Sequence, residues 1–197
     1  PLRKAAFVER DGTLNEMVYD ATHGLLDSPR RPEQVALMKN AAKFLSRLRE
    51  LGFLIVIVTN QPGISKGTLT GPELDAVNQR LADLLEPAGW DDLRFCPHHP
   101  DFGSTCDCRK PKPGMLLQAA AEHGIDLGRS WMIGDGFVDV QAGRAAGCKS
   151  VLVTKLKISQ VEKFFDTNGV EPDAIVPDLM SALEVIEGRA QPRKFRE

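Results

Sequence analysis

The strongest constraint on the fold is a series of short apolar segments without polar alternation. In residues 53–60, FLIVIVTN, every position up to the closing Thr-Asn is apolar, and β-branched side chains dominate. A strand with apolar residues at every position is buried on both faces, as in a parallel sheet covered by helices on each side. Further strands are predicted over residues 4–9, 93–98, 130–135, 149–154 and 173–177.

Segments with helical periodicity lie between most of these strands. Over residues 33–51, apolar side chains recur at helical spacing, and Gly52 follows where a helix often ends. Residues 71–86 show the same spacing, and Thr70 and Glu73 are placed as a capping box at their start. Further helices are predicted over residues 113–123, 137–146, 158–167 and 178–187.

This alternation predicts an α/β fold of three layers: a Rossmann-like, mostly parallel sheet with helices on both faces. We expect a single domain over residues 1–188, because 197 residues suffice for one full hydrophobic core. The connections over residues 10–32 and 61–70 are too short to hold a large cap domain. Residues 189–197 are polar and basic and are expected to form a C-terminal tail.

Composition favours a cytoplasmic protein without nucleic-acid or membrane partners, and we expect a monomer. The formal net charge is −2, so no basic field favours nucleic acid or anionic lipid. The longest apolar runs are too short to cross a bilayer, and no signal-like segment opens the chain.

Polar side chains gather where the predicted strands end. The first strand runs into residues 9–13, ERDGT, the second into residues 59–61, TNQ, and the strand near 130 into Asp135, with Asp139 four residues on. In such sheets, ligands bind beyond the carboxyl ends of the strands. Carboxylates from two strands could share a hard cation such as Mg²⁺, and hydroxyl, amide and lysine groups could hold a phosphoryl group. Asp135 could equally be the N-cap of the next helix.

Three of the four cysteines lie in one short loop, residues 96–108, which we predict to bind zinc. Three thiolates and one imidazole form a closed tetrahedral set, as structural zinc requires. Cys108 directly precedes Arg109 and Lys110, so the metal would fix the backbone that presents these two cations. Cys148 stands apart and is interpreted as a packed thiol. The predicted zinc ligands are Cys96, His98, Cys106 and Cys108.

The chain resembles the haloacid dehalogenase (HAD) superfamily of phosphatases. Four motifs carry the resemblance, in order: acid-x-Asp-Gly-Thr, Thr-Asn-Gln, Arg-Lys-Pro and Gly-Asp-x-x-x-Asp. The stretches RDGTLN, TNQPGISKG, CDCRKPKPGM and GDGFVDVQAGRAAG are most similar to the D,D-heptose 1,7-bisphosphate phosphatase branch, with histidinol-phosphate phosphatases as near relatives. The resemblance extends over roughly the whole chain. It implies a Mg²⁺-dependent enzyme that removes the 7-phosphate from D-glycero-D-manno-heptose 1,7-bisphosphate through an acyl phosphate.

The resemblance also implies roles for individual positions. Glu9 stands at the nucleophile position, which also binds Mg²⁺. Asp11 would be the general acid–base, and its backbone carbonyl would bind the metal. Asp135 would complete the Mg²⁺ site, with Asp139 in support. Thr59, Asn60 and Lys110 would complete the catalytic set, and Arg109 and Lys110 would contact the substrate. Independently of the resemblance, residues 60–67 could form a phosphate-facing turn with Ser65 and Lys66, or simply an exposed loop before the next helix. Thr13 and Gln61 are further candidate substrate contacts.

Glu9 departs from the family pattern, which has aspartate at this position. Glutamate keeps the charge but moves the attacking oxygen, and a misplacement of about 1 Å can slow a reaction on the order of 100-fold. We therefore expect binding of Mg²⁺ and phosphate ligands with much reduced turnover. Two alternatives stay open: a histidinol-phosphate phosphatase, and a non-catalytic phosphosugar-binding protein. A nucleic-acid 3′-phosphatase is disfavoured by the near-neutral charge.

Overall fold

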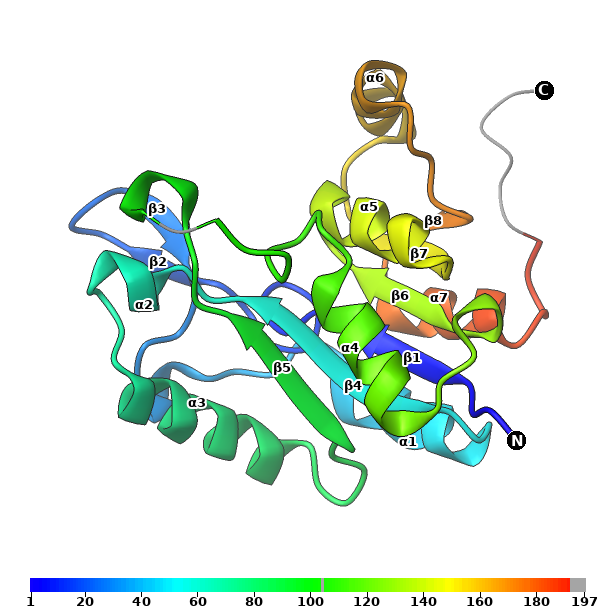
Figure 1. Ribbon diagram of the computed structural model, residues 1–197, viewed down its shortest axis with the longest axis horizontal. Coiled ribbons are helices and arrows are strands. Elements are labelled where there is room, and N and C mark those ends of the chain that lie inside the picture. Colours follow the sequence, from blue (N-terminus) through cyan, green and yellow to red (C-terminus); the bar gives the residue numbers. More distant parts are fainter. Residues whose placement is uncertain (104, 192–197) are drawn as a thin grey trace.

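The computed structural model describes residues 1–103 and 105–191, and its centre is a six-stranded sheet (Figure 1). Every neighbouring pair of strands in this sheet is parallel. In the order β5-β4-β1-β6-β7-β8, strand β1 lies in the interior of the sheet, between β4 and β6. The strands are β1 (Ala5–Val8), β4 (Leu54–Asn60), β5 (Asp92–Cys96), β6 (Trp131–Gly134), β7 (Lys149–Val153) and β8 (Ala174–Val176).

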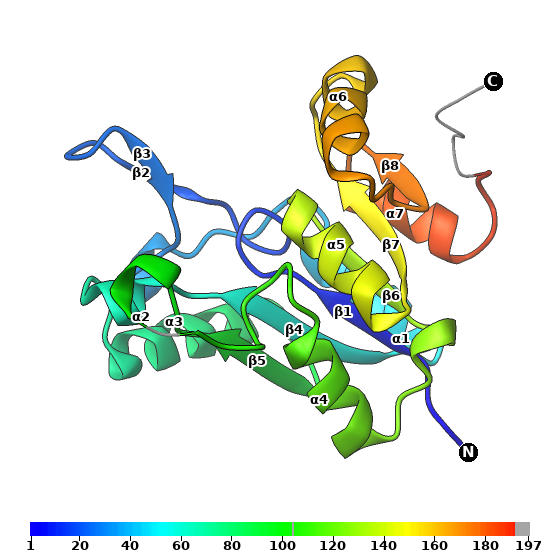
Figure 2. The same cartoon turned by 45° about the horizontal axis from the view of Figure 1, so that its top comes forward.

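Helices cover both faces of the sheet (Figure 2). One face packs against α1 (Ala41–Glu50), α3 (Gly71–Leu84) and α7 (Leu179–Ile186). The other face packs against α4 (Gly114–His123) and α5 (Phe137–Ala146), and α6 (Ile158–Asn168) lies against α5 and β7. The predicted three-layer α/β architecture is therefore confirmed.

The two faces of β1 illustrate why the apolar strands need cover on each side. Ala6 and Val8 point into the core under α1 and α3, whereas Ala5 and Phe7 point into the core under α4 and α5. Each buried side chain of the size of Phe7 stabilises the fold by about 1.5–3 kcal/mol relative to exposure. Such a strand is rigid, so the residues that directly follow it are held in place.

The helix predicted over residues 33–51 is wrong in its first half. Residues Pro32–Gln34 form a single 3₁₀ turn, and α1 begins only at Ala41, after Asn40 in a left-handed conformation with φ of 65°. The intervening backbone pairs instead with the loop after β1: Met38 N donates to Leu14 O at 2.8 Å. Long-range hydrogen bonds thus replace the intrahelical bonds that the apolar spacing suggested.

Two elements near the sheet edge were not predicted. A two-stranded antiparallel hairpin, β2 (Val18–Asp20) and β3 (Leu25–Asp27), follows β1, and the short helix α2 (Gly63–Lys66) follows β4. The hairpin carries exposed apolar side chains, including those of Tyr19 and Leu26.

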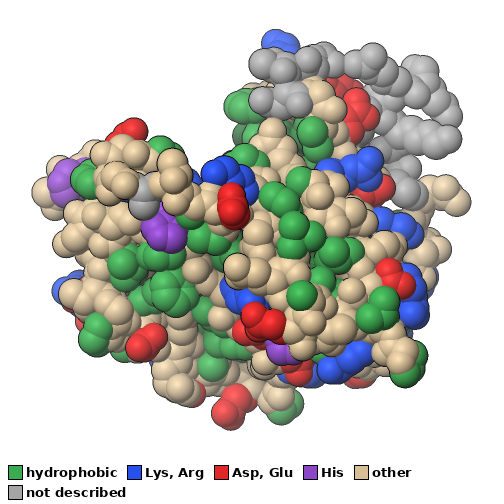
Figure 3. Space-filling model, in the orientation of Figure 1, with side chains coloured by type: hydrophobic (Ala, Val, Ile, Leu, Met, Phe, Trp, Pro, Cys, Tyr) green, Lys and Arg blue, Asp and Glu red, His purple; other side chains and the backbone are tan. Residues whose placement is uncertain are grey.

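The remaining predictions about the surface have mixed outcomes. The predicted C-terminal tail, residues 189–197, is described as far as residue 191, and residues 192–197 lie outside the described part. No helix in the described ranges is both long and apolar enough to cross a membrane. On the face drawn in Figure 3, acidic and basic side chains are interspersed.

Candidate active site

The carboxyl ends of β1, β4 and β6 meet at one edge of the sheet, because these strands are parallel neighbours. Glu9 directly follows β1, Thr59 and Asn60 end β4, and Asp135 directly follows β6. The loop before α4 brings Lys110 to the same place. The structure therefore gathers residues from all four sequence motifs at this edge.

Lys110 is at the centre of a buried cluster of charges. Its ammonium Nζ donates to Glu9 Oε2, to Asp139 Oδ1 at 2.6 Å and to the backbone oxygen of Val58 at 2.8 Å. Lys110 is 1% exposed, Asp139 2% and Glu9 8%. A buried ammonium is tolerated only when carboxylates and hydrogen bonds compensate the loss of water, and here two carboxylates and a carbonyl do so.

Thr59 provides the other hydrogen bond to Glu9. Its hydroxyl donates to Glu9 Oε1 at 2.7 Å and accepts a hydrogen bond from Gln61 Nε2 at 3.1 Å. Both carboxylate oxygens of Glu9 are thus bound by groups expected to hold a phosphoryl group.

Asn60 fixes the backbone of Lys110 rather than pointing into open space. Asn60 Oδ1 accepts from Lys110 N, and Asn60 Nδ2 donates to Lys110 O, each at 3.0 Å. The side-chain amide of Asn60 therefore binds both backbone polar groups of Lys110, in the way that a residue on a neighbouring β-strand would. The lysine loop is consequently attached to the end of β4.

Asp11 is surrounded by hydrogen-bond donors. Asn15 Nδ2 donates to Asp11 Oδ1 at 3.0 Å, while Ser28 Oγ and Gln61 Nε2 donate to Oδ2 at 2.7 and 2.8 Å. The guanidinium of Arg10 contacts both oxygens. Burial pushes the pKa of Asp11 up, but the charge of Arg10 and these hydrogen bonds outweigh it and hold the pKa below its usual value. Asp11 is therefore ionised in this arrangement.

The carboxylate of Asp135 lies against the loop after β1. Thr13 Oγ1 donates to Asp135 Oδ1 at 3.1 Å, and a Cβ at Gly12 would lie 2.2 Å from Asp135 Oδ2. Gly12 also has φ of +80°, so both its conformation and its surroundings require glycine. Asp135 is exposed to solvent, but partial desolvation of its carboxylate, together with the charge of Asp139, raises its pKa to about 6.

The helix N-cap role considered for Asp135 is not what the structure shows. The N-cap of α5 is Gly136, and Asp139 Oδ2 accepts from Gly136 N at 3.0 Å. Asp139 thus links the first turn of α5 to Lys110 through its two oxygens. Asp135 remains available for another role.

The oxygen atoms near Asp135 suit a magnesium ion. Mg²⁺ prefers hard oxygen ligands and binds one or two carboxylates plus substrate oxygens. Glu9 and Asp135 directly follow two adjacent strands, β1 and β6, and the close approach of Asp135 to Gly12 brings the backbone of residues 11–13 beside it. The Asp11 carboxylate faces Arg10, which is consistent with a backbone rather than a side-chain ligand from this residue.

The predicted zinc ligands lie together. Their four ligand atoms are within 4.8 Å of one another. Cys96 Sγ lies 2.9 Å from Cys108 Sγ and 3.6 Å from Cys106 Sγ, and His98 Nδ1 lies 3.3 Å from Cys108 Sγ. A tetrahedron around a metal bound at about 2.0–2.3 Å has edges of roughly 3.3–3.8 Å. The separations of 3.3 and 3.6 Å fit these edges, whereas Cys96 Sγ and Cys108 Sγ, at 2.9 Å, would have to move apart to bind the ion. Three sulfurs and one nitrogen are a donor set typical of structural zinc.

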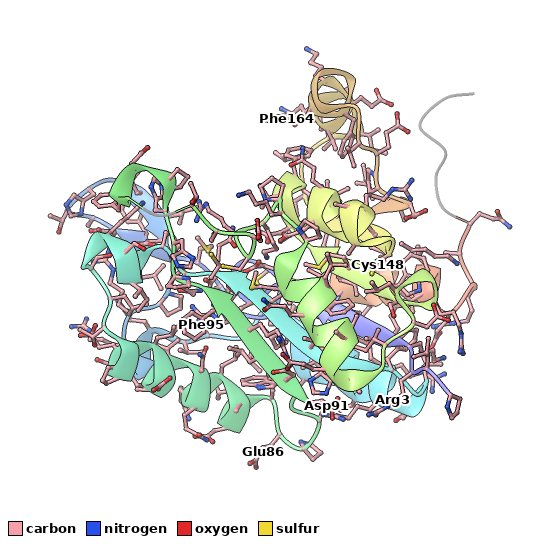
Figure 4. The ribbon with its side chains drawn as sticks, viewed as in Figure 1. Arg3, Glu86, Asp91, Phe95, Cys148 and Phe164 are labelled. Carbon is pink, nitrogen blue, oxygen red and sulfur yellow. The ribbon has the colours of Figure 1, made fainter. Side chains whose placement is uncertain are left out.

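The other cysteine and histidine nearby take different roles. His99 Nδ1 accepts from Asp101 N at 3.2 Å and so stabilises a 3₁₀ turn. Cys148, labelled in Figure 4, is buried at the start of β7 among the apolar side chains under α4 and α5. The structure agrees with its interpretation as a packed thiol.

Arg109 is held by the zinc loop, since its Nη1 donates to His98 O at 3.1 Å. Ser65, an expected substrate contact, donates instead to the backbone oxygen of Pro97 and so joins α2 to this loop. Lys66 lines a cavity of about 420 Å³ between the hairpin and α2, together with Gln61 and Arg30. Of the expected substrate contacts, Lys66 and Gln61 therefore line this cavity, although Gln61 itself is buried and its amide donates to Asp11 and Thr59.

Comparison with known proteins agrees with these observations. A family model described as HAD-hydrolase-like matches residues 107–182. The D-glycero-β-D-manno-heptose-1,7-bisphosphate 7-phosphatase of Pasteurella multocida is 36% identical over 160 residues, which cover 78% of this chain and 83% of that protein. The D-glycero-D-manno-heptose-1,7-bisphosphate 7-phosphatase of Chlorobaculum tepidum is 34% identical over 192 residues, covering 91% and 92%. The chain belongs to the heptose bisphosphate phosphatase family of HAD-like hydrolases.

A solved structure of this family supports the same conclusion. The D,D-heptose 1,7-bisphosphate phosphatase from B. bronchiseptica, crystallised with magnesium and phosphate, superposes with a TM-score of 0.77. It is 28% identical, and the superposition covers 95% of this chain and 99% of that one. The resemblance inferred from the four motifs is therefore confirmed.

Sequence reasoning missed several residues of the site. Arg10, Asn15 and Ser28 bind the Asp11 carboxylate, and Asn78 on α3 accepts from Arg10 Nη1 at 2.7 Å. Only Arg10 could have been identified from the sequence, because it is a charged residue directly beside the end of a buried strand. Nothing in the sequence spacing of Ser28, which follows β3, or of Asn78, on α3, indicates that they approach residues 10 and 11.

Proposed function

We propose that this chain is a Mg²⁺-dependent phosphatase that removes the 7-phosphate from D-glycero-D-manno-heptose 1,7-bisphosphate, with turnover strongly reduced by Glu9. The observation that carries the proposal is the convergence of Thr59, Lys110 and a carboxylate at position 9 on one buried point. Two donors beside a nucleophile are the arrangement that phosphoryl transfer needs, because this reaction depends on positioning and charge neutralisation. The names of the relatives supply the substrate.

In the first step, a carboxylate oxygen of Glu9 would attack phosphorus while the bond from phosphorus to the sugar oxygen breaks. Asp11 would give a proton to that leaving oxygen. In the second step, Asp11 would take a proton from water, whose oxygen attacks phosphorus and releases phosphate and the free Glu9 carboxylate. Lys110 and Thr59 would bind the phosphoryl oxygens throughout.

Asp11 needs a change of conformation for the first of these steps. In the arrangement seen here it is ionised and bound to Arg10, Asn15, Ser28 and Gln61, which suits the acceptance of a proton. To protonate a leaving group, Asp11 must first take up a proton, either from solvent or from the attacking water of the preceding turnover. Its carboxyl must also turn away from some of these donors, which hold it in the ionised form. Ser28, directly after the hairpin, and Gln61, directly after β4, are the partners nearest the open side, since both line the adjoining cavity.

Glu9, Asp135 and the backbone carbonyl of Asp11 would hold Mg²⁺. When bound, the ion would offset the negative charge of the phosphoryl group and of the nucleophile. The zinc loop would act indirectly, by fixing the segment that carries Arg109 and Lys110. Arg109 and Lys66 would contact the second phosphate of the substrate.

The decisive experiment compares the protein with the Glu9→Asp variant on heptose 1,7-bisphosphate and on histidinol phosphate, by measuring phosphate release. We expect the variant to act on the heptose substrate on the order of 100-fold faster, because aspartate restores the position of the attacking oxygen. Glu50→Asp, which shortens an exposed glutamate on α1, is the control and should leave the rate of phosphate release unchanged. Higher activity on histidinol phosphate would reassign the substrate. Binding without turnover, even in the Glu9→Asp variant, would indicate a phosphosugar-binding protein. Size-exclusion chromatography of the same preparation tests the expected monomer.

A further inference from the structure

The donors that surround Glu9 have no hydrogen left for a ligand. The ammonium of Lys110 has three N–H groups, and its three acceptors are Glu9, Asp139 and the carbonyl of Val58. The hydroxyl of Thr59 has one hydrogen, which it donates to Glu9 at 2.7 Å. A phosphoryl group that binds Lys110 and Thr59 must therefore replace one of their present acceptors.

Glu9 is the acceptor that can be replaced. The carbonyl of Val58 belongs to β4 in the middle of the sheet and cannot move. Asp139 is bound at its other oxygen by the amide of Gly136 at the start of α5. Glu9, in contrast, reaches its two donors through a flexible side chain with three rotatable bonds.

The length of the Glu9 side chain brings its carboxylate to these donors. An aspartate on the same backbone would end one carbon–carbon bond earlier, so its carboxylate would lie about 1.5 Å closer to β1. Hydrogen bonds weaken steeply when donor and acceptor separate by that amount. Because of the extra methylene, the carboxylate of Glu9 occupies the place between Thr59 and Lys110 where a phosphoryl group would bind.

We propose that Glu9 is an internal competitor for the phosphoryl-binding donors, so that phosphate binds only when the Glu9 carboxylate swings out of the seat formed by Thr59 and Lys110. The inference rests on the proposed function, because it takes these two residues to be the phosphoryl-binding donors. It goes beyond that function because it concerns ligand affinity instead of the rate of chemistry. The exchange is one anion for another, so the buried ammonium of Lys110 keeps a partner throughout.

The test is the affinity for inorganic phosphate, measured by isothermal titration calorimetry in magnesium-free buffer. Chelators are left out so that any zinc stays in the loop. The protein is compared with Glu9→Asp, which has the same charge and one methylene less. We expect Glu9→Asp to bind phosphate at least about tenfold more tightly, because its carboxylate leaves both donors free. Equal affinity of the two proteins overturns the inference, since simple charge repulsion would act on both alike.

Two further variants separate this inference from the proposed function. Thr59→Val and Lys110→Met are each made in the Glu9→Asp background, and circular dichroism establishes which of them folds. We expect either substitution to lower the phosphate affinity of Glu9→Asp by about tenfold or more. If phosphate affinity depends on Thr59 or Lys110 but not on the length of the position-9 side chain, the inference fails and the phosphate seat stands. If neither donor affects phosphate affinity, the seat itself is elsewhere, and both the inference and the proposed function are overturned.

Glu9→Gln provides an independent measure of the charge effect. This variant keeps the length of the side chain and removes its charge. If competition for the donors governs affinity, Glu9→Gln should bind phosphate less tightly than Glu9→Asp, because its amide oxygen still accepts from one of the two donors. The opposite order would show that charge dominates and would overturn the inference. Glu50→Asp again serves as the control for an unrelated loss of one methylene.

Discussion

Arg10 lies fully buried beside Asp11 and binds it with two parallel hydrogen bonds, from Nε to Oδ1 at 3.0 Å and from Nη2 to Oδ2 at 3.2 Å. A guanidinium in this geometry fixes both the charge and the orientation of a carboxylate. The remaining end of Arg10 donates to Asn78, so the pair is attached to α3. The orientation of the predicted general acid–base is therefore set from the interior of the protein.

Arg10→Met should destabilise the fold by about 3–5 kcal/mol, because it leaves the Asp11 carboxylate buried without its compensating charge. Urea denaturation followed by circular dichroism measures the change. The double variant Arg10→Met/Asp11→Leu should recover part of the loss, since both charges are then absent. If Arg10→Met is as stable as the unaltered protein, the pair does not contribute to stability in the way described.

Magnesium affinity should fall as the pH drops through about 6. Mg²⁺ binds the ionised form of Asp135, and its pKa of about 6 means that the proton competes increasingly below that pH. At one pH unit below the pKa, about a tenth of the carboxylate is ionised, so the dissociation constant should be about tenfold higher than at pH 8. Calorimetric titration with Mg²⁺ between pH 5 and 8 checks this, with zinc content monitored. An affinity independent of pH would contradict the role given to Asp135.

Gly12→Ala should abolish Mg²⁺ binding. The new Cβ would lie 2.2 Å from Asp135 Oδ2 and must push this carboxylate away from the loop after β1. Gly147→Ala is a matched control, because Gly147 also has a positive φ, of +91°, but open space around its missing Cβ. Both variants should lose about 1–2 kcal/mol from backbone strain, and only Gly12→Ala should lose the metal. Equal Mg²⁺ affinity in the two variants would argue against a site at Asp135.

Removal of zinc should disturb the position of Arg109 more than that of Lys110. Arg109 is bound to the carbonyl of His98 inside the loop, whereas Lys110 is attached to Asn60 and Val58 on β4. Cys106→Ser should therefore lower the melting temperature and weaken heptose bisphosphate binding, while the affinity for inorganic phosphate changes less.

Cys148→Ala is the control for this experiment, because Cys148 lies outside the cluster. Zinc content by metal analysis should fall in Cys106→Ser and stay constant in the control. Unchanged stability and substrate affinity after loss of zinc would show that the loop is fixed by other contacts.

The fold could be predicted from sequence where one physical signal dominated. Apolar runs such as residues 54–58 fit a strand buried on both faces, and the structure buries every one of these side chains. The prediction of a helix from residue 33 was wrong, because an extended segment packed against the loop after β1 can have the same apolar spacing. Leu37 takes part in a bridge with Asn15 there, and sequence spacing does not reveal such long-range pairing.

The candidate site was predictable where the motifs themselves supply the side chains. Glu9, Thr59 and Lys110 meet as expected, and so do the four zinc ligands. The use made of Asn60 was not foreseen, since its amide holds a backbone segment. The sequence does not reveal whether a polar side chain faces a ligand or binds a neighbouring backbone segment, because this depends on small differences in atomic position in the folded protein.

The interior position of β1 has a consequence for how the protein is made. Strand β1 pairs with β4 on one side and with β6 on the other, and these two partners lie far apart along the chain. A nascent polypeptide can assemble the first pair early, but it must wait for residues 131–134 before the second edge is closed. Until that part of the chain has been synthesised, Lys110 lacks its partner Asp139, and the buried charge cluster at the end of β1 is incomplete.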